Sequence, residues 1–131
     1  MNYIKLNGIS FDADVAISKY TRYFRTLDGP NAGRVMSCLM VRDVLGTYLG
    51  HEITVFRRGN NYKGLDDFWE YLYAHSVDDS VLLEAADGQT TIAYEAYYTS
   101  ATQSLEKVEN GVNYWGEIEV SFVPMDAQVK P

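Results

Sequence analysis

The stretch GLDDFWEYLYAH, residues 64–75, decides the fold, because it is the one segment that clearly predicts an α-helix. Its large apolar residues recur at i, i+3, i+4 and i+7, which places them on one face of a helix. We expect this set to anchor the helix in the core: Leu65, Phe68, Trp69 and Leu72. Asp66 and Asp67 are expected in the first turn, at the positive end of the helix dipole, and His75 closes the far end.

An amphipathic helix of this kind has two interpretations. It could dock into a partner groove or onto a membrane surface, but its polar side lacks the lysine and arginine enrichment of membrane-bound helices. A lone helix in a small β protein normally covers the open face of the sheet, and we favour that arrangement. Truncation of Trp69 to alanine is then expected to destabilise the protein by about 3–5 kcal/mol.

Strand patterns flank the helix on both sides. Before the helix, the chain predicts a short strand over 3–6, a turn at Asn7-Gly8, a long strand over 14–26 with a bulge near Lys19, and strands over 35–46 and 46–58. After the helix, strands are expected at 81–85, 91–99 and 114–123, with turns at 86–89 and Asn110-Gly111 and a polar segment over 100–111.

The last strand has the clearest alternation in the chain. Its apolar side chains are expected to face the core and its polar side chains solvent, the two sets being Ile118, Val120 and Phe122, and Glu117, Glu119 and Ser121. Pro124 should end the strand, because proline has no N–H to donate to a neighbouring strand. Residues 125–131 are expected to be a loose tail, or to be borrowed by a neighbouring molecule.

Together these elements predict an α+β protein, a mostly antiparallel β-sandwich or barrel-like sheet with one flanking α-helix over about 64–75. A length of 131 residues corresponds to one domain, which we expect to span 1–131. Apolar residues make up 47% of the chain and aromatic residues 14%, and this composition excludes a disordered protein.

Charge and cysteine content limit the partners and the compartment. The formal net charge of −7 argues against binding to the phosphates of nucleic acid, because such binding needs a basic patch. Cys38 is the single cysteine, so an intramolecular disulfide is excluded and a reducing compartment is expected. The N-terminus lacks a signal-peptide pattern and no stretch approaches a bilayer span, so we expect synthesis in the cytoplasm without membrane insertion.

The strongest loop signal covers residues 27–34, which combine glycine, proline, aspartate and asparagine. The glycine spacing does not fit a phosphate-binding P-loop, because no Gly-Lys followed by Ser or Thr is present. A strand connection or a partner-contacting loop fits better. The candidate interface residues are Asp28, Gly29, Pro30, Asn31, Gly33 and Arg34.

Catalytic and metal-ligating residue types are present without the spacing that their chemistry needs. The candidates for a metal or a nucleophile are His51, His75 and Cys38, which follow no Cys-x-x-Cys or His-x-x-x-His pattern. The carboxylate pairs suit helix-start, turn and solvated-strand positions better than acid–base catalysis: Asp66/Asp67, Asp78/Asp79 and Glu117/Glu119. We expect no catalytic residue, metal site or cofactor, and therefore a protein that is not an enzyme.

Four segments carry a resemblance to a known group of proteins. They are Leu6-Asn7-Gly8-Ile9-Ser10-Phe11, the loop 27–34, Arg42-Asp43-Val44-Leu45-Gly46-Thr47-Tyr48 and the closing stretch NYWGEIEVSFVPM at 113–125. Through them, nearly the whole chain resembles small structural proteins of bacteriophage and prophage tails, of the minor-tail, tail-tube or distal-tail type. The resemblance implies a β-sandwich with a flanking helix that assembles into rings, often hexameric, and it marks no site residue.

The expected function is that of a non-enzymatic structural component of a bacteriophage tail, located in the virion tail, which forms homo-oligomeric rings and contacts other tail proteins. A loop rich in glycine and proline could reach the next ring, and acidic residues around a lumen would let DNA pass without sticking. The alternative is a stand-alone β-sandwich module whose tyrosine-rich face binds a carbohydrate or a peptide.

Overall fold

The computed structural model describes residues 4–28, 33–34, 40–42 and 44–130, with the side chains of 34, 40 and 41 excepted. The elements are β1 (Ile4–Leu6), β2 (Ala13–Val15), the 3₁₀ turn η1 (Ile17–Lys19), β3 (Thr21–Asp28), β4 (Gly33–Arg34), β5 (Met40–Val41), β6 (Val44–Arg57), α1 (Tyr62–Ala74), β7 (Val81–Asp87), β8 (Thr90–Tyr97), β9 (Ala101–Glu109) and β10 (Val112–Pro124). The predicted fold class is confirmed: the protein is α+β, a mostly antiparallel sheet with a single α-helix in the described part.

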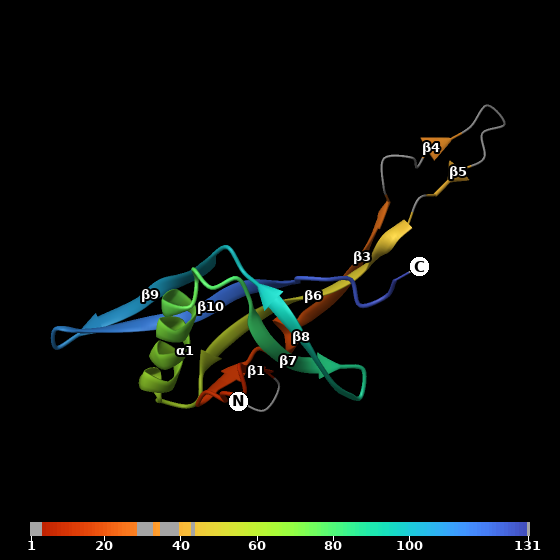
Figure 1. The fold of residues 1–131 in the computed structure, drawn as a ribbon. Coiled ribbons are helices and arrows are strands. Elements are labelled where there is room, and N and C mark those ends of the chain that lie inside the picture. Colours follow the sequence, from red (N-terminus) through yellow and green to blue (C-terminus); the bar gives the residue numbers. More distant parts are fainter. Residues whose placement is uncertain (1–3, 29–32, 35–39, 43, 131) are drawn as a thin grey trace.

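The long strands β6 and β10 form the centre of the sheet. Residues 51–55 of β6 pair with residues 118–122 of β10, all in antiparallel register. Beyond that overlap β10 turns to pair with β8 at Val123 and Pro124, and β8, β7 and β1 continue the sheet from there. The sheet therefore curls into a half-barrel, so that β1, β7 and β8 lie across from β9, β10, β6 and β3 (Figure 1).

The helix packs inside this curl and closes the core. Leu65, Phe68 and Leu72 are at most 2% exposed, as the helical spacing predicts. Phe11 meets Phe68 edge to face, with 5.2 Å between the ring centroids. Trp69 is only partly buried and packs against the edge of the core, because the helix turns this side chain toward β9 and β10.

The helix begins earlier than the apolar spacing predicts. Its cap is Asn61, whose side-chain oxygen accepts a hydrogen bond of 3.0 Å from the backbone N–H of Gly64. Since the helix then starts at Tyr62, the prediction that Asp66 and Asp67 lie in its first turn is wrong. The far end is as expected, with His75 as the C-cap.

Two strand predictions also need correction. The expected strand over 14–26 is two strands, β2 and β3, separated by η1, so the change of register near Lys19 is a 3₁₀ turn and not a bulge. The polar segment over 100–111 contains β9, which forms a hairpin with β10 around the correctly predicted Asn110-Gly111 turn. Of the expected strand over 35–46, residues 35–39 and 43 lie outside the described residues.

The closing segment binds along β6 of its own chain, whereas the sequence predicts a loose tail or one borrowed by a neighbouring molecule. The Gln128 side chain forms two hydrogen bonds with the backbone of Leu49, at 2.8 Å and 2.9 Å. Val129 forms a β-bridge with Thr47, on the edge of β6 opposite β3. Residues 128 and 129 thus extend the sheet where β10 has turned away. Pro124 ends β10 as predicted, and Ile118, Val120 and Phe122 are buried as predicted.

Candidate assembly interface

One face of the strands β9, β10, β6 and β3 points away from the core and is polar. In register, Glu119 lies opposite Thr54 on one side and Thr102 on the other, and Ser121 lies opposite Glu52. A shallow hollow of about 540 Å³ lies over this face. We call this polar face the outer face. Its side chains include carboxylates, hydroxyls and Lys19, and Tyr23 and Arg25 of β3 lie on it beside Glu52.

Carboxylates outnumber cations on the outer face, with Glu52, Glu117 and Glu119 against Lys19 and Arg25. Lys19 pairs with Glu117, with 3.1 Å between the ammonium nitrogen and the carboxylate oxygen. Glu52 and Glu119 have no cationic partner in the described part of the chain. The sequence correctly predicts that Glu117 and Glu119 face solvent, and the fold adds Glu52 from β6 to the same surface.

Strand β9 is a free edge of the sheet. Among the described residues it pairs only with β10, over Ala101 to Glu109. Leu105 and Val108 are 47% and 59% exposed on this edge. An unpaired edge with exposed apolar side chains is a template for pairing with another chain.

Strand β3 is the free edge on the other side. Within the described ranges it pairs only with β6, from Thr21 to Asp28. Phe24 is 73% exposed and Leu27 is 39% exposed. The two edges are chemically different, so a contact between β9 of one copy and β3 of the next would be a head-to-tail contact.

The two edges are staggered along the sheet. Strand β9 lies beside residues 112–120 of β10, whereas β3 lies beside residues 44–52 of β6, at the opposite end. Figure 1 shows the result, with the β9–β10 hairpin and the β3–β6 ribbon extending from the body in opposite directions. Stagger of this kind is what a sheet needs in order to close into a barrel.

The described residues of the predicted interface loop lie at the end of β3 and in β4. Asp28 ends β3 and accepts two hydrogen bonds from the Arg42 guanidinium, at 3.2 Å and 3.3 Å. Gly33 and Arg34 form β4, which pairs with β5. The other three candidates, Gly29, Pro30 and Asn31, lie outside the described residues.

His51, considered in the sequence for metal or nucleophilic chemistry, is fully buried at the inner end of the sheet. Its Nδ1 lies 2.6 Å from the hydroxyl of Tyr94, and its Nε2 has no hydrogen-bond partner among the described residues. Burial lowers the pKa of His51 and raises the pKa of Tyr94, so both groups stay neutral at pH 7. His51 is fully buried and Tyr94 is packed against the core, so their hydrogen bond is a contact within the core.

The remaining chemical candidates do not converge. The His75 Nδ1 lies 2.7 Å from Asp78 at the surface, whereas His51 is fully buried in β6. Cys38 lies outside the described residues. In the part of the chain that the structure describes, no three histidine, cysteine, aspartate or glutamate side chains are grouped to hold a metal ion. No described helix is long and apolar enough to cross a membrane.

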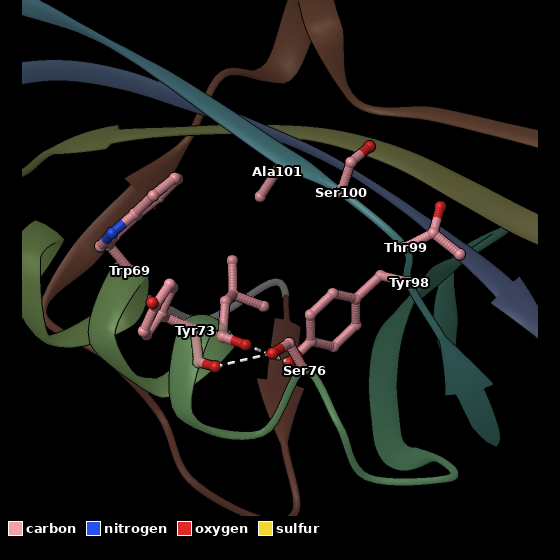
Figure 2. A pocket seen from close by; sticks show the side chains of 8 residues that line it. Trp69, Tyr73, Ser76, Tyr98, Thr99, Ser100 and Ala101 are labelled. Carbon is pink, nitrogen blue, oxygen red and sulfur yellow. Dashed lines mark hydrogen bonds between the residues drawn. The ribbon is translucent and has the colours of Figure 1, made fainter.

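An apolar groove of about 260 Å³ runs between the end of α1 and the β8–β9 connection (Figure 2). Two of its hydroxyl groups bind the helix backbone: Tyr98 donates to the carbonyl of Leu72 at 2.6 Å, and Ser76 donates to that of Tyr73 at 2.8 Å. What remains toward the groove is mainly the surface of Trp69, Tyr73 and Ala101. These two hydrogen bonds tie the groove to the last turn of the helix.

Neither a protein-family model nor a curated protein matches this chain.

Proposed function

We propose that this chain is a non-enzymatic structural subunit of a bacteriophage tail, which closes into a ring by pairing the free edge β9 of one copy with the free edge β3 of the next. The observation that carries the proposal is the four-stranded arrangement of β9, β10, β6 and β3, which ends in two different unpaired edges among the described residues. The assignment to a phage tail depends on the resemblance of the four sequence segments.

Strand direction permits this closure. Each neighbouring pair in the series β9, β10, β6 and β3 is antiparallel, so β9 and β3 run in opposite directions. In a ring all copies have the same orientation, and β3 of one copy therefore meets β9 of the next as an antiparallel neighbour. The ladder of hydrogen bonds can continue from copy to copy without a change of strand polarity.

Side-chain chemistry supports the same arrangement. Pairing would cover the exposed apolar groups on both edges, chiefly Phe24 and Leu27 on β3 and Leu105 and Val108 on β9. The outer face would then line the inside of the ring with Glu52, Glu117 and Glu119. A wall with excess negative charge repels phosphates, which suits a channel through which DNA passes.

The edge contact can be tested with Phe24→Lys. A lysine on β3 places charge in the proposed apolar contact while leaving the buried core unchanged, because Phe24 is 73% exposed. We expect a folded protein whose half-assembly concentration rises at least about tenfold. Light scattering after size-exclusion chromatography measures the mass across a concentration series.

Val77→Lys is the matched control. Val77 is 88% exposed in the turn after α1, outside both edge strands, and the charge change is the same. The control should assemble like the unchanged protein. The proposal would lose its basis if the Phe24→Lys protein assembled as well as the Val77→Lys control. It would also lose its basis if the unsubstituted protein stayed monomeric at every concentration.

A further inference from the structure

A second groove, distinct from the one in Figure 2, lies between α1 and the β9–β10 hairpin. It measures about 390 Å³, within the size range of small-ligand sites. Its lining comes from both elements: Asp66, Trp69 and Glu70 from the helix, and Gln103, Asn113 and Trp115 from the hairpin. Trp69 is common to both grooves.

The two tryptophans of the chain both line this second groove. Trp115 is 37% exposed, and neither indole stacks on another aromatic ring in the described part of the chain. In an uninterrupted strand Trp115 would share the outer face with Glu117 and Glu119. Register shifts on both sides of Trp115 break that alternation, and the indole lies beside the helix residues instead.

Hydrogen bonding supports the displaced strand at this point. The Gln103 side chain donates from Nε2 to the carbonyl of Gly116 at 2.8 Å, which satisfies a group that the irregular pairing leaves free. A β-carbon added at Gly116 would lie only 3.3 Å from the carbonyl of Ser104, so the strands approach closely here. The irregular pairing of the β9–β10 hairpin therefore determines the position of the Trp115 indole.

The two carboxylates of the second groove lack a direct ion-pair partner among the described residues. Asp66 and Glu70 form no hydrogen bond or ion pair in the residues that the structure describes, because the nearby Lys63 is bound to Asp67 at 3.0 Å. Burial, and then the charges of Glu70 and Asp67, raise the pKa of Asp66. Two accessible π-faces thus stand beside two unpaired carboxylates.

We propose that the second groove binds an organic ammonium group, through the faces of Trp69 and Trp115 and the carboxylates of Asp66 and Glu70. The face of an indole attracts cations, more strongly than the face of tyrosine or phenylalanine. The carboxylates supply the opposite charge, and a bound cation relieves their mutual repulsion. A neutral sugar leaves that repulsion in place, and an anion is repelled by it.

Choline is a direct probe, because it carries a trimethylammonium group on a small polar chain. Both tryptophans lie in the groove, so the intrinsic tryptophan fluorescence of the full chain reports occupancy without a label. We expect a saturable fluorescence change with choline. The uncharged isostere 3,3-dimethyl-1-butanol should bind at least about tenfold more weakly, because it has the same shape without the charge.

The variant Asp66→Asn/Glu70→Gln removes the two charges while keeping side-chain size, and should weaken choline binding at least about tenfold. The control Asp79→Asn/Glu84→Gln changes the net charge equally at positions outside the groove, and should bind choline normally. The inference is overturned if choline gives no saturable change, if the isostere binds as tightly, or if both double variants lose binding equally. A saturable response to maltose in place of choline would assign the groove to saccharides instead.

Discussion

His51 is the residue whose burial has the clearest consequence for stability. It is closed in by Tyr20 and Tyr94, with the Arg22–Asp87 ion pair nearby, and desolvation lowers its pKa below the ordinary value of 6.5. Above pH 6.5 the imidazole is neutral in both the folded and the unfolded chain. Below pH 6.5, His51 binds a proton in the unfolded chain while it stays neutral in the folded chain. Folding stability therefore falls as the pH decreases toward the pKa of His51 in the folded chain.

We therefore expect the free energy of unfolding to fall more steeply between pH 7.5 and pH 5.5 than it does in a His51→Gln protein. Urea unfolding at both pH values measures the difference for each protein. The comparison removes the contribution of the carboxylates, which titrate in both. An identical pH dependence in the two proteins would show that His51 is protonated normally in the fold.

Gly64 is a second residue at which the surroundings reverse the usual expectation. In an exposed helix, Gly→Ala stabilises by about 1 kcal/mol. Here the added methyl group would collide with the backbone carbonyl of Asp12, so we expect Gly64→Ala to destabilise by about 1–3 kcal/mol. The neighbouring exposed substitution Lys63→Ala should change the stability little, since it removes one surface ion pair. Thermal unfolding of both variants shows whether each substitution raises or lowers the stability of the protein.

For single residues, the sequence shows which side chains are chemically notable but does not show which side chains they contact. It names His51 as chemically notable, but its partner Tyr94 is 43 positions away, and no local pattern predicts that pairing. The prediction for Asp66 and Asp67 is wrong for a local reason: the residues before Gly64 are mostly polar and only Tyr62 continues the apolar spacing, so the helix start after Asn61 is hard to recognise. Glu117 and Glu119 were placed correctly because strand alternation is local.

Among the elements, α1 shows how far an apolar pattern predicts burial. The pattern makes Leu65, Phe68, Trp69 and Leu72 equivalent, but the curl of the sheet covers only part of that face, and Trp69 lies at its margin. Which residues lie at the margin depends on contacts with β9 and β10, distant in sequence. The edge strand β9 escaped prediction because both of its faces are largely exposed, so it has no period-two pattern.

This arrangement changes the expected effect of truncating the helix anchors. Phe68→Ala should destabilise the protein by about 3–5 kcal/mol, because Phe68 is fully buried. Trp69→Ala should cost no more than about half of that, since its indole borders two grooves. Denaturant unfolding of the two variants, followed by circular dichroism, gives the comparison. A cost for Trp69→Ala equal to that of Phe68→Ala would place the indole in the core after all.

In the whole molecule, the curled sheet leaves its two long edges open, and the proposed ring follows from that feature. The sequence predicts an antiparallel sheet, since turns and alternation are local signals. It does not predict which strands lie at the edges, because strand order depends on pairing between distant segments such as β6 with β10. The edges and the outer face could therefore be recognised only in the folded chain.

Electron cryomicroscopy of the concentrated protein, alone and with neighbouring tail proteins, tests the central claim most directly. We expect closed rings in which β9 of each copy lies antiparallel to β3 of the next, with Glu52, Glu117 and Glu119 facing the central channel. Particles that stay monomeric under both conditions, or that assemble with β9 and β3 exposed to solvent, would contradict the account.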